Sequence, residues 1–310
     1  MNNSDQVDLR IAEVADAPAM LHVIHAAFGA RPAVDPPAAA LDETVESIQR
    51  RLAMAPGVIA EVDGEIVGCL LTSIHGVTGG LHRVSVLPGR RTRGVAAQMV
   101  RGAGEVLAEL GAHRVELLCR KEFPETLKWW TDHGFRVLRP ASLGQVMGIE
   151  LPARVEVPTG EAMRELGHRL AELLQAGDVV VASGDLGAGK TTLTQGIGAG
   201  LDVEGPVISP TFVLSRVHAS RSGGPALVHV DAYRLGSEAE LFDLDLDLTL
   251  PESVTLVEWG AGLAEGLADS VLQIDITRSS DPDDETRVVH LMGFGPRWYE
   301  VDLHQLGKDN

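Results

Sequence analysis

The chain has 310 residues, of which 45% are hydrophobic, and a formal net charge of −18. This length suggests two domains with substantial cores, and no apolar run reaches the roughly 18 residues needed to span a bilayer. An acidic surface is a poor one for direct nucleic-acid binding, because that binding depends on Lys and Arg side chains that neutralise phosphates.

The charge is distributed unevenly. Residues 1–150 contain 15 basic and 18 acidic side chains, whereas residues 151–310 contain 11 and 26. If the second half serves RNA, we therefore expect a partner protein to contact the RNA. The amino terminus shows no signal peptide, and Cys69 and Cys119 lack metal or redox spacing. These features, with histidines that lack zinc-site spacing, predict a cytoplasmic protein without zinc.

The first half alternates predicted strands and helices. We expect strands at residues 9–14, 58–62, 66–74, 81–86, 113–119 and 134–138, with a last strand ending near Leu151. Predicted helices cover residues 16–28, with Asp16 as N-cap, then 42–54, a long run ending at Leu110, and 124–133. Residues 148–158 are expected to link the two halves.

A phosphate-binding pattern opens the long helix. Residues 86–96 read VLPGRRTRGVA, so small residues and arginines lie at a helix N-terminus, where a pyrophosphate can bind. Val86, Pro88, Arg91, Gly94 and Ala96 match in register the V-x-P and [Q/R]-x-x-G-x-[G/A] signature of the GNAT acyl-CoA-dependent N-acetyltransferases, which this half resembles. The resemblance implies an acetyl-CoA site formed by Val86, Arg91, Arg93, Gly94, Val95 and Ala96.

The resemblance extends to Gly134-Phe135 but departs at Trp130. Many members of the GNAT family have at this place a Tyr that protonates the leaving thiolate, and an indole N–H is not a usable acid near neutral pH. Either another group supplies the proton, or the domain binds coenzyme A with little turnover. Glu61 and His82 are candidate bases, with ordinary strand positions as the alternative. The resemblance implies a small-molecule or protein amine as the acceptor.

The second half opens with a helix over residues 159–175 and a strand over 178–182. Residues 184–191 then read GDLGAGKT, the G-x-x-x-x-G-K-[ST] spacing of a P-loop, followed by a helix over 191–201. In such a loop we expect inward-facing backbone N–H groups to bind phosphate, Lys190 to reach the terminal phosphates and the Thr191 hydroxyl to ligate Mg²⁺. The expected ATP-binding residues are Gly184, Asp185, Gly187, Ala188, Gly189, Lys190, Thr191 and Thr192.

Two later carboxylates end predicted strands. Asp231 closes the strand 228–231, where a second strand of a P-loop sheet meets Mg²⁺ directly or through water. Glu258 closes the strand 254–257 and can orient the attacking water or contact the Mg²⁺. Thr211 lies in a loop that can approach the γ-phosphate. Lys190, Glu258 and Thr211 are the predicted catalytic residues.

Four segments together resemble the TsaE family over residues 155–275. They are GDLGAGKTT at 184–192, SPTF at 209–212, HVDAYRL at 229–235 and LVEWG at 256–260. The resemblance implies a small bacterial P-loop ATPase that supports synthesis of N6-threonylcarbamoyladenosine in tRNA. It implies slow ATP hydrolysis that resets a complex of TsaB with TsaD, so that tRNA is contacted only indirectly.

The sequence thus predicts an α/β protein of two domains. A GNAT-like domain with a mixed sheet covers residues 1–151, and a P-loop NTPase domain covers 152–310. Strands at 271–277 and 287–293 complete the second domain, and Asp243, Asp245 and Asp247 form an acidic solvated face instead of a Ca²⁺ loop. Two alternatives stay open: an N-acetyltransferase regulated by a nucleotide-sensing P-loop half, and a small-molecule kinase, for which an Arg-rich lid is missing.

Overall fold

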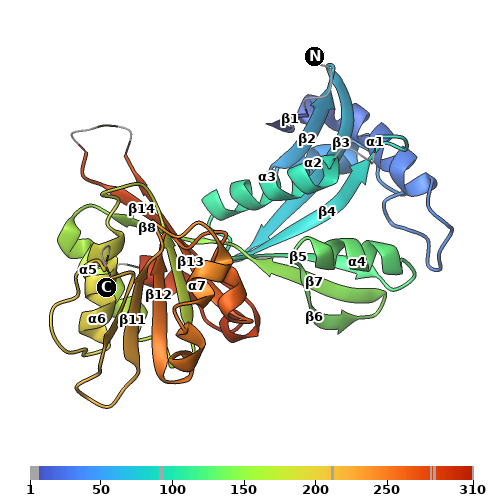
Figure 1. Cartoon of the computed structure of the whole chain (residues 1–310). Helices are drawn as coiled ribbons and strands as arrows, with labels where there is room; N and C mark the ends of the chain where they lie inside the picture. The colour runs from blue at the N-terminus through green and yellow to red at the C-terminus, as the bar shows by residue number, and fades with distance from the viewer. Residues whose placement is uncertain (1–6, 91–93, 211–212, 280, 282–283, 309–310) are drawn as a thin grey trace. The chain divides into compact units, whose positions relative to one another are not determined.

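The computed structural model describes residues 7–90, 94–210, 213–279, 281 and 284–308. The chain divides into two compact units, Met1–Leu151 and Pro152–Asn310. Each unit is a mixed α/β structure with its own sheet (Figure 1). The predicted fold class, two α/β domains in succession, is confirmed.

The first unit builds one sheet in the order β1-β2-β3-β4-β5-β7-β6 from its described residues. Its elements are β1 (Asp8–Ile11), η1 (Val14–Asp16), α1 (Ala17–Gly29), α2 (Val45–Leu52), β2 (Gly57–Val62), β3 (Glu65–His75), β4 (Thr78–Val86), α3 (Val95–Glu109), β5 (Arg114–Arg120), α4 (Pro124–Asp132), β6 (Arg136–Ala141) and β7 (Gly144–Glu150).

Helices cover both faces of this sheet. Met20 and Ile24 of α1 and Ile48 of α2 pack with Cys69 and Leu71 of β3 on one face. On the other face, α3 buries the residues of its apolar stripe, and α4 adds one aromatic side chain; these residues are Val95, Met99, Ala103, Leu107 and Trp130. The i, i+4 spacing along α3 places its stripe on a single face, which fixes the helix against the sheet.

Strands β4 and β5 part from each other within this sheet. They pair in parallel where Thr78–Gly80 face Arg114–Glu116, and β4 then continues to Val86 and β5 to Arg120 along diverging paths (Figure 1). In this diverging part, β4 also carries a bulge against β3, where Arg83 has a φ of +53°. A bulge of this kind locally bends a strand and re-aims its side chains.

The second unit forms a sheet in the order β10-β11-β12-β9-β13-β14-β8, again counted over its described residues. Its elements are β8 (Ala153–Val157), α5 (Gly160–Ala171), β9 (Val179–Ser183), α6 (Lys190–Gly200), β10 (Ser215–His218), β11 (Ala226–Asp231), α7 (Glu238–Phe242), η3 (Leu246–Leu248), η4 (Leu250–Glu252), β12 (Ser253–Glu258), η5 (Glu265–Leu267), β13 (Val271–Arg278), β14 (Arg287–Phe294), η6 (Pro296–Trp298) and η7 (Leu303–Gly307).

The centre of the second sheet is parallel, because β9 lies between β12 and β13 and β11 joins β12 on the outside. The carboxyl ends of β9, β11 and β12 therefore meet at one edge, which is where ligands bind in open α/β sheets. Helices α5 and α6 cover one face (Figure 1). Val179, Val181 and Val257 pack on the opposite face with Leu241 and Leu246.

Several predicted boundaries were wrong. The first strand ends at Ile11, and Val14–Asp16 form a 3₁₀ helix. Asp16 is the N-cap residue of α1, as predicted, but its side chain does not cap the helix, because its carboxylate accepts hydrogen bonds from Arg10 and from the Glu13 N–H. Part of the predicted link is strand β8, which pairs with β14. The edge strand β10 was not predicted.

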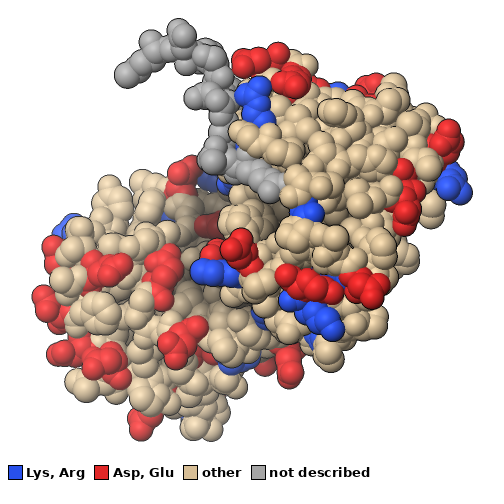
Figure 2. All heavy atoms as spheres, turned by 90° about the vertical axis from the view of Figure 1, so that its right-hand side faces the viewer, with Lys and Arg blue, Asp and Glu red and all other residues tan. Residues whose placement is uncertain are grey.

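Acidic side chains predominate over basic ones on the face shown in Figure 2. The aspartates of the predicted acidic face follow α7 and lie beside the buried Leu246, and Leu248, which follows Asp247, is 75% exposed. No helix in the described part of the chain is long and apolar enough to cross a membrane.

Candidate functional site

The loop between β9 and α6 depends on glycine. Gly184, Gly187 and Gly189 have φ values of +139°, +77° and +113°, which L side chains rarely adopt. A Cβ atom at Gly184 would lie 2.4 Å from the Ile276 carbonyl oxygen. The backbone of the loop can therefore pass close to β13 because residue 184 has no side chain.

This loop leads directly into the N-terminus of α6. Gly189 is the N-cap residue of α6, and it has no side chain that could accept a hydrogen bond from the first N–H groups of the helix. Unsatisfied N–H groups at the positive end of a helix dipole form an anion site. The loop and helix together therefore fit the phosphates of a nucleotide.

Lys190 lies inside this loop. Its Nζ donates hydrogen bonds to the carbonyl oxygens of Gly184 at 2.6 Å and Asp185 at 3.0 Å, and it lies 3.7 Å from the ring centre of Trp259. Burial lowers the pKa of Lys190, and the carboxylates of Glu258, Asp231 and Asp185 act in the opposite direction. A bound phosphate can replace the carbonyl oxygens as the partner of this ammonium group.

Glu258 lies beside the hydroxyl group predicted to bind Mg²⁺. Thr191 Oγ1 donates to its carboxylate, 3.0 Å from Oε1 and 3.2 Å from Oε2. His229 Nε2 lies 2.8 Å from Oε1, and the Glu258 side chain is 3% exposed. A hydroxyl and a carboxylate that leave most positions to water and phosphate fit the ligand preference of Mg²⁺.

Asp231 ends the neighbouring strand and pairs with Glu258 in the strand register. Its carboxylate accepts hydrogen bonds from Ser209 Oγ at 3.0 Å and from the Tyr233 N–H at 3.1 Å. Asp231 therefore faces the segment that leads toward Thr211. Thr211 itself lies outside the described residues.

A small pocket of about 110 Å³ adjoins the P-loop. It is lined by the start of α5, the loop glycines and the beginning of β14: Thr159, Gly160, Met163, Gly187, Ala188, Gly189, Thr192, Glu285 and Arg287. This places the predicted Gly187, Ala188, Gly189 and Thr192 on a cavity that continues from the phosphate loop. Sequence reasoning did not identify Thr159, Glu285 or Arg287 as site residues.

His229 was also missed as a site residue. It lies two residues before Asp231 on β11, and residues two apart in a strand share a face. That spacing was the available signal, but its significance depends on the pairing of β11 with β12. His229 is opposite Leu256 in this pairing, which makes Glu258 its diagonal neighbour.

The predicted acetyl-CoA site begins in the same way as the P-loop. Gly94 is the N-cap of α3, has a φ of +68° and makes no side-chain cap. The side chains of Val86 and Val95 are buried in the core, so both residues can contact a ligand mainly through their backbone. Arg91 and Arg93 lie outside the described residues.

Trp130 belongs to the core of the first unit. Its side chain is 6% exposed and contacts the ring of Phe135 edge-on, with ring centres 4.8 Å apart. Because this indole is packed and cannot act as an acid near neutral pH, it cannot protonate a thiolate. Trp130 therefore does not supply the acid that a Tyr provides at this place in many GNAT enzymes.

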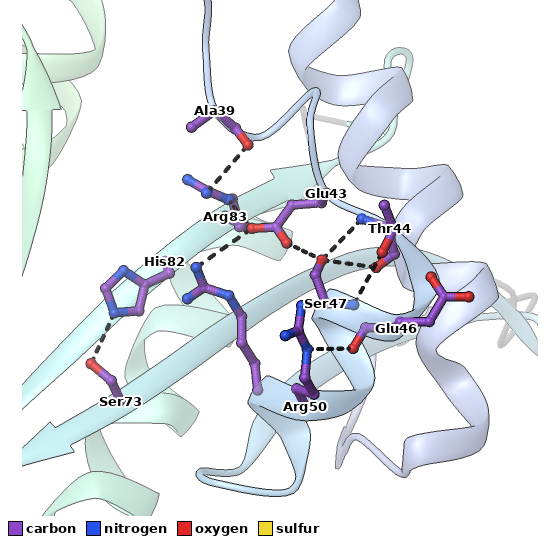
Figure 3. A network of polar contacts seen from close by, with 10 residues as sticks. Ala39, Glu43, Thr44, Glu46, Ser47, Arg50, Ser73, His82 and Arg83 are labelled. Atoms are coloured by element: carbon purple, nitrogen blue, oxygen red, sulfur yellow. Dashed lines mark hydrogen bonds and ion pairs between the residues drawn. The ribbon is translucent and has the colours of Figure 1, made fainter.

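A polar cluster lies where β4 bulges (Figure 3). Arg83 Nε donates to Glu43 Oε1 at 2.8 Å and Arg83 Nη2 donates to the Ala39 carbonyl oxygen at 3.4 Å, while Ser47 donates to the same carboxylate group. The neighbouring His82 is hydrogen-bonded to Ser73 across the strands, with 2.8 Å between Nε2 and Oγ.

Glu61 and His82 were the two candidate bases of the first unit. Burial lowers the pKa of His82, and the cations of Arg51 and Arg83 and the His75 ring lower it further, whereas Glu43 raises it. Glu61 is instead paired with Arg10 at 2.8 Å on the β1–β2 edge. Of the two candidate bases, His82 is therefore the one next to the β4 bulge.

The glycine-rich loop at the start of α6 and the parallel sheet behind it define a P-loop domain, which follows another α/β domain in the same chain. Residues 157–288 match the family model described as threonylcarbamoyl adenosine biosynthesis protein TsaE, and residues 24–135 match that of the acetyltransferase (GNAT) family. The chain belongs to the TsaE family and carries a GNAT domain before it, as the sequence motifs predicted.

Curated relatives match the second unit. The tRNA threonylcarbamoyladenosine biosynthesis protein TsaE of Streptomyces coelicolor is 57% identical over 146 residues, which cover 46% of this chain and 99% of that protein. The protein of the same name from Mycobacterium leprae is 58% identical over 120 residues, covering 36% and 74%. An N-acetyltransferase of Thermoplasma acidophilum, solved with coenzyme A, is 12% identical with a TM-score of 0.43, covering 47% of this chain and 99% of that one.

Proposed function

We propose that the second unit is an Mg²⁺-dependent ATPase that supports formation of N6-threonylcarbamoyladenosine in tRNA by acting on a complex of TsaB with TsaD. The observation that carries this proposal is the convergence of Lys190, Thr191 and Glu258 at the N-terminus of α6. The names of the curated relatives support a role in the biosynthesis of threonylcarbamoyladenosine in tRNA.

Each residue then has a defined role. The loop amides and Lys190 hold the phosphates, and Lys190 leaves the carbonyl oxygens of Gly184 and Asp185 to do so. Thr191 and Glu258 hold Mg²⁺, which when bound neutralises phosphate charge. Asp231, at the end of the neighbouring strand, binds Mg²⁺ directly or through water. Its hydrogen bond from Ser209 connects the Mg²⁺ site to the segment that contains Ser209 and Thr211. The pocket lined by Thr159 and Arg287 receives the nucleoside.

The acidic balance of the second unit supports a protein partner over direct tRNA binding. With 26 acidic and 11 basic side chains in residues 151–310, this unit lacks the excess of cations that RNA phosphates require. We therefore place the tRNA on the partner complex. The reaction belongs in the cytoplasm, and the two free, buried cysteines are compatible with its reducing conditions.

A measurement of phosphate release tests this proposal directly. The full chain is incubated with ATP and Mg²⁺, alone and with cognate TsaB and TsaD. We expect slow hydrolysis that depends on Mg²⁺ and changes when the partners are added. Hydrolysis that is absent under both conditions would contradict an ATPase, and hydrolysis that ignores TsaB and TsaD would contradict the partner assignment.

For the first unit we propose acetyl-CoA-dependent N-acylation of an amine. The Gly94 N-cap binds the pyrophosphate, and the part of the sheet where β4 and β5 no longer pair receives the thioester arm. His82 takes the proton that an acceptor ammonium group must lose before its nitrogen attacks, because a histidine with a lowered pKa is unprotonated at neutral pH. The polar cluster around Glu43 forms the wall beside it.

The alternative main function is N-acetylation regulated by a nucleotide-sensing P-loop unit, which the same helix N-terminus at Gly94 supports. A panel of small and peptide amines with acetyl-CoA separates the two, with thiol release as the readout and calorimetry for coenzyme A binding. Efficient turnover that responds to ATP favours the alternative. Coenzyme A binding without turnover of any amine would contradict it and leave the ATPase as the main activity.

A further inference from the structure

A buried histidine, His229, is hydrogen-bonded to the Glu258 carboxylate of the nucleotide site. The His229 side chain is fully buried at 0% exposure, and its Nε2 lies 2.8 Å from Glu258 Oε1. A buried polar side chain is costly unless it is hydrogen-bonded, so this contact is what makes a histidine tolerable at that position in the core.

The direction of this hydrogen bond follows from the surroundings of the ring. His229 Nδ1 is buried and has no hydrogen-bond partner among the described residues. A hydrogen on Nδ1 would be a buried donor without an acceptor, whereas the ionised Glu258 carboxylate can only accept. The hydrogen is therefore on Nε2, and His229 donates it to Oε1.

Glu258 has few other constraints on its orientation. Thr191 donates to both carboxylate oxygens, but that hydroxyl is itself a proposed Mg²⁺ ligand. Thr194 Oγ1 donates to the Lys190 carbonyl oxygen at 2.9 Å, and its contact with Oε1 is longer, at 3.5 Å. Among the described residues, His229 is thus the nearer of the two Glu258 partners that are not proposed ligand-binding residues.

We propose that His229 is a positioning residue that holds the Glu258 carboxylate in the orientation needed at the Mg²⁺–phosphate site. This inference rests on the proposed function of the second unit. The hydrogen bond from β11 fixes Oε1 and leaves Oε2 and the remaining lone pairs directed at the Thr191 side. Partners that orient a metal-binding carboxylate in this way typically contribute about 10- to 100-fold to metal affinity or activity.

The alternative is that His229 only fills the core. His218 provides a matched control, because it is also a buried histidine, on the neighbouring strand β10, and its Nδ1 contacts the Glu204 carbonyl oxygen. A purely structural role predicts similar effects at both histidines on thermal stability and on activity. A positioning role predicts an effect on Glu258 that His218 does not have.

The test uses the full chain with His229→Leu, His229→Gln, His218→Gln and Glu258→Gln. Glutamine can present an amide N–H near the place of His Nε2, whereas leucine cannot donate. The readouts are the apparent Mg²⁺ affinity with ADP bound, followed by fluorescence, the rate of ATP hydrolysis, and the melting temperature. The Mg²⁺ titration does not depend on hydrolysis.

We expect His229→Leu to weaken Mg²⁺ binding and to slow ATP hydrolysis, each by about tenfold or more. The affinity for ADP in the absence of Mg²⁺ should change less. His229→Gln should recover most of both losses, and His218→Gln should match the wild type. In Glu258→Gln, adding His229→Leu should cause little further loss, because residues that act as a unit are not additive.

Three results would overturn the proposal: wild-type Mg²⁺ affinity in folded His229→Leu, losses in His218→Gln as large as those in His229→Leu, or full additivity with Glu258→Gln. Failure of the ATPase itself is distinguishable, since the wild type would then release no phosphate. The Mg²⁺ titration would in that case still decide the role of His229.

Discussion

The two proposed phosphate sites use the same kind of structure and differ in what surrounds it. Both α3 and α6 start at a glycine with positive φ, +68° at Gly94 and +113° at Gly189, and neither helix has a side-chain cap. In the second unit, the ends of adjacent parallel strands bring Glu258 and Asp231 to the helix. In the first unit, the neighbouring strands β4 and β5 separate instead.

Under the proposed functions, the helix N-terminus provides binding, whereas the neighbouring strands determine the chemistry. Converging strand ends bring the carboxylates of Asp231 and Glu258 to the start of the helix. Where β4 and β5 diverge, His82 lies beside the β4 bulge instead. Three experiments test whether this contrast is real, beginning with the largest expected effect.

Removing the Lys190 ammonium should have the largest effect. Lys190→Ala is expected to lower ATP affinity or turnover by about a hundredfold or more, because a buried cation aimed at phosphate is lost. Coenzyme A binding to the first unit should stay unchanged. Calorimetry with both ligands measures this. If Lys190→Ala binds and hydrolyses ATP like the wild type, the assigned phosphate site is wrong.

Replacing the glycines compares the two loops directly. In Gly184→Ala the Cβ would meet the Ile276 carbonyl oxygen at 2.4 Å, so the loop must shift and nucleotide affinity should fall at least about tenfold. At Gly94 a Cβ meets no described atom within 4 Å, so the left-handed backbone costs only about 1–2 kcal/mol. Coenzyme A affinity should fall little in Gly94→Ala; equal losses in both variants would contradict the comparison.

The polar cluster of the first unit should make its stability depend on pH. Burial raises the pKa of Glu43, but hydrogen bonds from Ser47 and Arg83 and the charges of Arg83 and Arg51 leave it below its ordinary value of 4.5. The stability that the Glu43 carboxylate contributes to the folded state is therefore fully present above pH 4.5, and it is lost as the pH falls through the lower folded-state pKa of Glu43.

Arg83→Met should destabilise the first unit by about 1–3 kcal/mol near neutral pH and by less in acid. Denaturant unfolding across this pH range measures the effect. The control is Arg139→Met, which breaks a pair between Glu116 and an Arg139 side chain that is 56% exposed, and should cost less than about 1 kcal/mol. Equal losses in both variants at every pH would exclude the buried pair as the cause.

The sequence predicted features that are encoded locally. The loop glycines, Lys190 and Thr191 form one contiguous motif, and Gly94 and Ala96 form another, so spacing was enough to find them. The two families and the order of the domains followed from these motifs. The alternation in residues 153–157 also signalled strand β8, with Ala153, Val155 and Val157 buried, but it was interpreted as a link.

Features that depend on strand register could not be predicted. Thr191 and Glu258 are 67 residues apart in sequence and meet because β12 lies next to β9. The His229 contact requires in addition that β11 pairs with β12 in one particular register. The bulge at Arg83 carries no glycine that would mark it. Such contacts are set by the sheet as a whole, and the spacing of residues along the chain does not reveal them.

The central claim is that the P-loop of this chain supports tRNA modification. Mass spectrometry of nucleosides from bulk tRNA tests it in bacteria depleted of their own TsaE and supplied with the cognate TsaB and TsaD. We predict that the wild-type chain restores N6-threonylcarbamoyladenosine and that Lys190→Ala does not. Restoration by Lys190→Ala to the wild-type level, or no restoration by the wild type, would contradict the account.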